Sequence, residues 1–190
     1  MKKGWLIALA VVAVIGFWGV GTYNSLVSMN VGIDTSWSQV QVQYQRRFDL
    51  IPNLVETVKG VANFEKSTYV AVTEARSAWA KAMQSGTRSE QIAATDNVQS
   101  ALSRLLVTVE NYPQLKANEN FKELQAQIEG TENRVSVARK DFNESIQPYN
   151  IKIQTFPSSL VARLFGFEKG AFFGSQAGAE SAPKVNFGTP

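Results

Sequence analysis

The sequence predicts an all-α protein in which an N-terminal transmembrane helix continues into an up-down bundle of long helices. Three observations lead to this fold class. No charged residue occurs from Gly4 to Ile33. After that run the apolar residues recur at steps of three and four, the period of an amphipathic helix. The sequence has neither the apolar-polar alternation of strands nor an Asn-Gly hairpin.

Residues 1–23 are predicted to form the membrane anchor. The apolar centre runs from Trp5 to Val20, and with the residues up to Tyr23 it reaches about 20 residues, enough to cross a hydrocarbon core of about 30 Å. Aromatic rings at both ends are typical of the headgroup level. A cleaved signal peptide is the alternative, but no Ala-x-Ala site follows. The predicted anchor residues are Trp5, Leu6, Ile7, Phe17, Trp18 and Tyr23.

The charges that flank this span predict its orientation. Lys2 and Lys3 precede the span, and the next basic residues after it are Arg46 and Arg47. The positive-inside rule therefore places the N-terminus in the cytoplasm and the body outside it.

Residues 24–157 are predicted to form a long-helix bundle. The first apolar stripe starts at Ile33 and is continuous with the membrane helix. Pro52 predicts a kink in it, and Asp49 is placed to cap a helix that restarts there. Gly60 is a second weak point, after which the stripe resumes and ends near Met83.

Two further stripes complete the bundle. One follows a capping-box pattern at Thr87 and ends before Pro113, because the residue before a proline disfavours the helical conformation. The other begins near Asn118 and ends at Pro157. Three long stripes joined by short turns predict an up-down bundle, and their length suits a rod on a membrane or a coiled-coil-like assembly that shares stripes between copies.

Residues 158–173 form an aromatic amphipathic segment with three possible uses: a last core layer, a surface that docks on a membrane, or a contact between subunits. Its contact residues would be Leu160, Leu164, Phe165, Phe167, Phe172 and Phe173. Residues 174–190 are rich in Gly, Ala, Ser and Pro and are predicted to be a disordered tail.

The composition excludes several kinds of site. The chain has 190 residues and contains no cysteine and no histidine. Disulfides, thiol nucleophiles, Ser-His-Asp catalysis and histidine-ligated metals are therefore absent. The formal net charge is +3, but Lys2 and Lys3 supply most of it and the remainder is nearly neutral. We expect no enzyme activity, no cofactor, no metal and no nucleic-acid partner.

The carboxylate pairs and the polar residues beside the stripes have ordinary structural interpretations. Glu119 with Glu123, and Glu129 with Glu132, could be a metal site, but solvated helix faces explain them better. Polar residues next to the apolar stripes, such as Arg47 and Arg139, are predicted to pair inside the bundle and fix the register of its helices. Binding of a partner protein is the alternative.

Several strings in the sequence resemble the LemA family of bacterial membrane proteins. The most specific is the run QRRFDLIPNLVETVKG from Gln45 to Gly60, and others are Thr131–Arg134, Phe142-Asn143 and Tyr149-Asn150. The motif residues, which we expect to be structural, are Arg46, Arg47, Asp49, Pro52, Asn53, Glu56, Arg76, Glu132, Asn133, Arg139, Asn143 and Asn150.

The resemblance implies one N-terminal membrane helix followed by a helical bundle at the bacterial inner membrane, and it implies no reaction. One member is associated with building magnetosome membranes, which suggests membrane organisation. The family's topology has also been described with the body in the cytoplasm, so both orientations stay open.

The function hypothesis is a non-enzymatic single-pass protein that acts as a helical scaffold or self-assembling organiser. An adaptor for an envelope protease or transporter is the alternative. The expected partners are the lipid bilayer, further copies of the chain as a homo-oligomer and, for the adaptor, another envelope protein.

Overall fold

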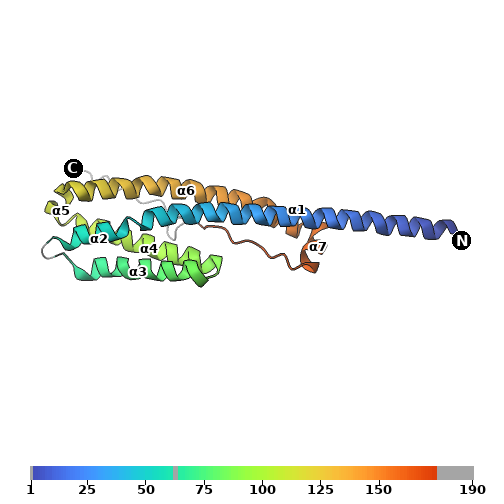
Figure 1. Cartoon of the computed structure of the whole chain (residues 1–190), viewed down its shortest axis with the longest axis horizontal. Coiled ribbons are helices and arrows are strands. Elements are labelled where there is room, and N and C mark those ends of the chain that lie inside the picture. Colours follow the sequence, from blue (N-terminus) through green and yellow to red (C-terminus); the bar gives the residue numbers. More distant parts are fainter. Residues whose placement is uncertain (1, 62–63, 175–190) are drawn as a thin grey trace, which may run out of the picture.

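The computed structural model describes residues 2–61 and 64–174, and the predicted tail from residue 175 onward lies outside the described residues. The described chain forms an elongated bundle from which one helix projects far beyond the others (Figure 1). All its regular elements are helices, which confirms the all-α fold class.

Helix α1 spans Lys2–Phe48 and has two halves with different surroundings. Its N-terminal half is largely exposed as far as Gly21: Phe17 is 81% exposed, and the most apolar 18-residue window has a mean hydropathy of 2.1 and no buried residue. The length and composition of this half suit a membrane span. Its predicted anchor residues from Trp5 to Trp18 all lie on this exposed surface.

The C-terminal half of α1 is a core helix. Its buried side chains recur at the steps of three, four and seven that place residues on one helix face; they are Leu26, Ile33, Trp37, Val40, Tyr44 and Phe48. This face packs against α6, which spans Glu119–Gln154 and runs antiparallel to α1 along the body (Figure 1).

The predicted break near Pro52 is present. Helix α2 spans Ile51–Lys59, with Pro52 in its first turn, where the missing N–H has no helical partner to lose. The predicted cap at Asp49 is wrong. Leu50 is the N-cap residue and no side chain caps α2, because Asp49 lies one residue too early and instead accepts a hydrogen bond of 2.6 Å from Gln45 Nε2.

The first apolar stripe does not continue as one helix to Met83. Helix α2 ends at Lys59 with Gly60 as its C-cap, and α3 (Lys66–Ser85) returns alongside it. The weak point at Gly60 is therefore a chain reversal. The bundle consequently has four antiparallel segments rather than three: α1 with α2, α3, α4 and α6 (Figure 1).

The remaining boundaries agree with the sequence. Helix α4 (Arg88–Val109) starts with the predicted capping box between Thr87 and Glu90. A short α5 (Pro113–Ala117) leads to α6, whose N-cap Asn118 accepts a hydrogen bond of 3.1 Å from the Phe121 amide. Helix α6 continues through Pro148.

After α6 the chain crosses the end of the bundle and returns. Helix α7 spans Ser158–Leu164, and the chain turns after it at Gly166, whose φ of 72° lies in the left-handed region that favours glycine. Residues 165–174, which we call the strap, then run back along the body as an extended segment (Figure 1).

Candidate functional site

The strap is held by two asparagines of α6. Asn150 donates from Nδ2 to the Gly170 carbonyl at 2.9 Å and accepts from the Gly170 amide at 2.9 Å. Asn143 does the same for Phe173, at 3.1 and 2.9 Å. The two asparagines are seven positions apart, close to two helical turns, and so lie on one face of α6. Each amide therefore pairs with an extended backbone as a neighbouring β-strand would.

Two further contacts fix the strap against α6. The Tyr149 hydroxyl donates to the Glu168 carbonyl at 3.0 Å. A Cβ on Gly170 would lie only 3.3 Å from the Ile146 side chain, so glycine allows the backbone to approach α6 closely. The strap is thus bound through its backbone and one small residue.

The strap also completes an aromatic layer of the core. The Phe173 ring lies 5.7 Å from the Trp37 ring and 5.4 Å from the Phe142 ring, and Trp37 and Phe142 are 5.1 Å apart. The guanidinium of Arg88 lies over both Trp37 and Phe142, at 5.6 and 5.5 Å from the ring centroids. Phe173 therefore covers buried aromatic surface of α1 and α6.

Arg139 joins three elements beside this layer. Its Nε donates to the Tyr44 hydroxyl on α1, and its Nη2 lies 3.1 Å from Asp96 Oδ1 on α4. The guanidinium also lies 4.9 Å from the Phe173 ring centroid. Burial raises the pKa of Tyr44 to about 12, although Arg139 acts in the opposite direction. Tyr44 is therefore a neutral hydrogen-bond partner in the folded chain.

A second arginine pairs with a carboxylate where α1 meets α6. Arg47 is only 4% exposed and forms an ion pair with Glu132, whose side chain is about half exposed. Burial lowers the pKa of Arg47, and Glu132 opposes that shift. Because a guanidinium has a very high ordinary pKa, Arg47 remains a cation and Glu132 supplies its counter-charge.

Polar contacts also tie α1 to the start of α4. Gln91 Oε1 accepts from Trp37 Nε1 at 3.0 Å and from Gln41 Nε2 at 3.1 Å, while its own Nε2 donates to the Gly86 carbonyl at 3.1 Å. These bonds fix how α4 lies against α1.

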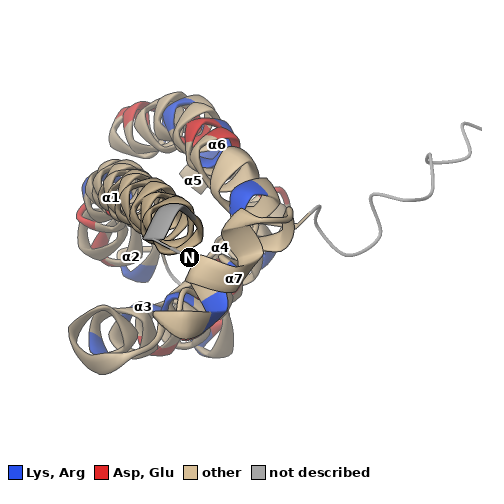
Figure 2. Ribbon diagram, turned by 90° about the vertical axis from the view of Figure 1, so that its right-hand side faces the viewer, with Lys and Arg blue, Asp and Glu red and all other residues tan. Residues whose placement is uncertain are grey.

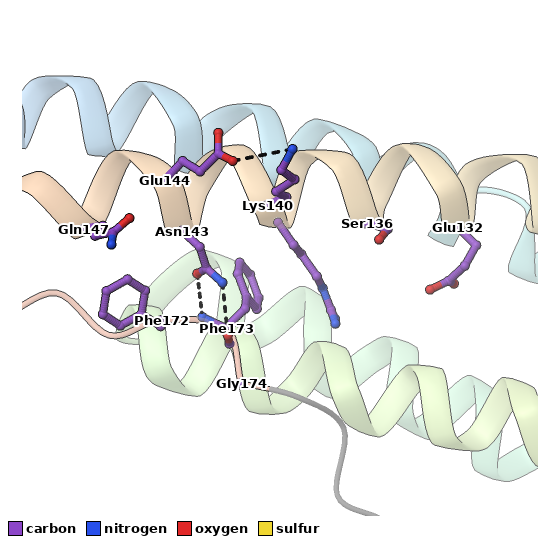
Figure 3. Close-up of a pocket in the computed structure, with 10 residues that line it drawn as sticks. Glu132, Ser136, Lys140, Asn143, Glu144, Gln147, Phe172, Phe173 and Gly174 are labelled. Carbon is purple, nitrogen blue, oxygen red and sulfur yellow. Dashed lines mark hydrogen bonds and ion pairs between the residues drawn. The ribbon is translucent and has the colours of Figure 1, made fainter. Parts of the chain in front are cut away.

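A shallow hollow of about 520 Å³ lies between α6 and the end of the strap (Figure 3). Its rim is charged, with Lys140 and Glu144 paired at 3.5 Å. Phe172 and Phe173 form its apolar part, and Asn143 reaches the strap within it (Figure 3). The mixed lining suits contact with a polypeptide segment better than enclosure of a small ligand.

The comparison with family models decides the family. A model described as the LemA family matches residues 36–187. The chain belongs to the LemA family.

Individual relatives agree with this assignment. The magnetosome proteins MamQ 1 and MamQ 2 of Paramagnetospirillum magneticum are each 26% identical to this LemA-family chain in an alignment 195 residues long, which covers 88% of this chain and 71% of theirs. Protein LemA of Metamycoplasma hominis is 25% identical over 155 residues, which cover 81% of this chain and 69% of its own.

The LemA motif residues fall into two groups in the structure. One group makes contacts between elements: Arg47 with Glu132, Arg139 with Tyr44 and Asp96, Arg76 from its Nε to the Phe48 carbonyl at 3.1 Å, and Asn143 and Asn150 with the strap. The other group is exposed and comprises Arg46, Asp49, Pro52, Asn53, Glu56 and Asn133. The motif is therefore only partly a set of internal pairs.

The exposed group does not gather at one place. Asn53 and Glu56 line a shallow hollow between α2 and the start of α6, together with Asn120 and Glu123. Asn133 lines a separate hollow between α6 and α1. Glu129 accepts a hydrogen bond of 3.0 Å from Gln125, whereas Glu132 pairs with Arg47. Among the described residues, no three His, Cys, Asp or Glu side chains are grouped to hold a metal ion.

The six residues predicted as one contact patch are divided by the structure. Phe173 is buried in the core and Phe167 packs against Tyr23. Phe172 lines the hollow beside the strap. Leu160, Leu164 and Phe165 are exposed. The amphipathic segment therefore serves the core at one end and leaves an apolar surface at the other.

Some contact residues were not identified from the sequence. Gln91 lies on the buried face of α4 and Asp96 on an exposed face, and nothing in the neighbouring sequence marks them as partners of Trp37 and Arg139. In the sequence, Tyr44 occupies a position of the first apolar stripe. Its hydroxyl was the available signal, since a buried tyrosine usually has a hydrogen-bond partner.

Proposed function

We propose that this LemA-family protein is a non-enzymatic, single-pass protein of the bacterial inner membrane that acts as a self-assembling helical scaffold. The observation that carries the proposal is the continuity of α1. One unbroken helix, Lys2–Phe48, supplies both the exposed apolar span and a central face of the body. A rigid connection of this kind suits a structural element better than a flexibly tethered enzyme.

The body's internal contacts support the same conclusion. Arg47, Arg139, Asn143 and Asn150 make contacts within the chain. These groups therefore stabilise the arrangement of the helices and the strap. The magnetosome proteins among the relatives agree with a role in organising membranes.

Crosslinking in native membranes tests the scaffold. A photo-reactive residue at exposed positions of the body, such as Val107 and Val137, should give covalent dimers and larger oligomers of the chain. Light scattering of the detergent-extracted protein should give a mass above that of one 20.9 kDa chain plus its micelle. A monomer in both measurements would exclude self-assembly.

The hollow beside the strap favours a second candidate, an adaptor that binds another envelope protein. Its exposed Phe172 and the charged pair Lys140–Glu144 could contact a partner segment. A photo-reactive residue at Phe172 separates the two functions, because mass spectrometry of the crosslinked product identifies either this chain or a different protein.

We also propose that the body lies outside the cytoplasm, on the basis of Lys2 and Lys3 before the span. The absence of native cysteine makes the test simple. A cysteine at the exposed position Lys116 should react with a membrane-impermeant maleimide in cells whose outer envelope has been made permeable while the inner membrane remains intact. Labelling only after the inner membrane is lysed would reverse the orientation.

A further inference from the structure

The end of the body nearest the span carries an exposed apolar surface that no described element covers. It consists of Phe156, Leu160, Leu164 and Phe165, which are 77%, 58%, 79% and 57% exposed. We call these four residues the α7 patch. Large apolar side chains grouped in this way on a soluble surface usually mark a contact with another phase or molecule.

Contacts with α1 place the α7 patch at the level where the span ends. The Phe165 ring lies 4.7 Å from the Tyr23 ring, and Lys152, four residues before Phe156, donates to the Ser25 hydroxyl. From Trp5 to Tyr23 the helix rises about 27 Å, close to the thickness of a hydrocarbon core. With Trp5 near one interface, Tyr23 and therefore Phe165 lie near the other.

The direction of α7 matches a bilayer surface. Seen along the axis of the bundle, α7 lies across its end, whereas α1, α3 and α6 are seen end-on (Figure 2). A helix across the bundle axis lies roughly parallel to a membrane that α1 crosses. Val161 and Ala162 are buried against the body. Leu160 and Leu164, one helical turn apart, share another face that is free.

The charges around the α7 patch suit a lipid surface with anionic headgroups. Arg163 and Lys169 are exposed, and Glu168 is the acidic residue between them. An apolar helix face flanked by basic side chains is typical of helices that lie in the membrane interface. The neighbouring Tyr23 is at the depth that aromatic rings prefer.

We propose that α7 is a second membrane contact: the α7 patch inserts into the headgroup region beside α1 and holds the body upright on the bilayer. The proposal rests on the membrane anchor of the proposed function. The bilayer is the chosen occupant because the patch is continuous with the end of the span, so anchoring by α1 brings the patch to the lipid surface without a further partner.

The experiment uses the full-length chain, which has no native cysteine. Single cysteines replace Leu164 in the α7 patch, Leu9 in the span and Val107 on the body, and each carries an NBD fluorophore. The proteins are reconstituted into vesicles of phosphatidylethanolamine and phosphatidylglycerol that contain lipids with nitroxide at the headgroup or along the acyl chain. Val107 is the matched control, because it is an apolar side chain 66% exposed near the α5 end of the bundle.

The expected result is strong quenching at Leu164→Cys by the shallow nitroxide, strong quenching at Leu9→Cys by the deep nitroxide, and no quenching at Val107→Cys. Quenching at Leu9→Cys without quenching at Leu164→Cys would overturn the α7 proposal and leave the anchor intact. Absence of quenching at both positions would overturn the anchor itself.

A second copy of the chain is the competing occupant of the α7 patch. Oxidation of unlabelled Leu164→Cys protein in the same vesicles distinguishes a second copy from the bilayer as the occupant of the α7 patch. Disulfide-linked dimers, together with an absence of nitroxide quenching, would show that the patch is a contact between copies and would overturn the proposal. Monomers together with shallow quenching support the lipid contact.

Discussion

The two halves of α1 share one backbone but are built for different surroundings. In the N-terminal half apolar side chains cover every face and remain exposed. In the C-terminal half the buried apolar side chains form a single stripe against α6 and the rest of the body, and the exposed faces are mainly polar, with a few valines such as Val42. The comparison shows how hydrophobic periodicity, rather than total hydrophobicity, distinguishes a helix that faces lipid from one that faces a protein core.

Removing one phenylalanine from each half gives the largest expected contrast. Phe48 is 1% exposed and Phe17 is 81% exposed. Phe48→Ala should lower the free energy of unfolding of the body by about 3–5 kcal/mol, because it leaves a cavity against Tyr44 and Trp79. Phe17→Ala should leave that free energy unchanged. Chemical denaturation in mild detergent measures both, and equal losses would mean that the halves do not differ as described.

A charge introduced into each half tests the difference in surroundings directly. Val14 and Val42 are both exposed valines of α1. Val14→Arg should cost about 2.5–3.5 kcal/mol of membrane insertion at the centre of the span. Val42→Arg should cost almost nothing, because that position already faces water. The fraction of protein that resists alkaline extraction from membranes reports the result. Normal retention of Val14→Arg would contradict the span.

A pH titration sharpens the description of the buried half. Because burial raises the pKa of Tyr44 to about 12, the folded chain holds the phenol proton more tightly than the unfolded chain. The resulting stability is fully present below about pH 10 and is lost as the pH rises to about 12, a loss of about 2–3 kcal/mol. Unfolding measured across this range should show a shallower decline for Tyr44→Phe. Identical slopes for the two proteins would argue against burial of the phenol.

The smallest expected effect concerns how the strap covers the buried half of α1. Asn150→Ala removes both hydrogen bonds to Gly170 and should cost about 1–3 kcal/mol. The Gly170 amide should then exchange its hydrogen faster, as measured by hydrogen-deuterium exchange. Asn133→Ala on the exposed face of α6 is the matched control and should change neither quantity. Unchanged exchange in Asn150→Ala would show that the asparagine does not hold the strap.

The sequence was sufficient for elements whose signals are local. The capping box at Thr87, the start of a helix near Asn118 and the break near Pro52 each depend on a few neighbouring residues, and all are present. The reversal after Gly60 was missed because a periodic apolar stripe does not encode direction. The stripe of α2 and that of α3 have the same period whether the chain continues straight or turns back.

The candidate site was less predictable because its partners are distant in the sequence. Asn143 and Asn150 belong to the motif residues expected to be structural, and their partners are backbone groups of the strap, 30 and 20 residues further along the chain. A backbone partner leaves no side-chain signature in the sequence. The pairing of Arg47 with Glu132 agrees with the expectation that Arg47 pairs inside the bundle, because a buried cation requires a counter-charge.

The uninterrupted passage of α1 from the span into the body has a mechanical consequence. From Tyr23 to Phe48 the helix rises about 37 Å. A membrane helix changes its tilt when the thickness of the bilayer changes. With no hinge in α1 at the membrane surface, a change in tilt of about 10° would swing the end of α1 at Phe48 sideways by about 6 Å. Without the restraint proposed for the α7 patch, the body would therefore act as a lever that converts a small change in bilayer thickness into a larger displacement away from the membrane.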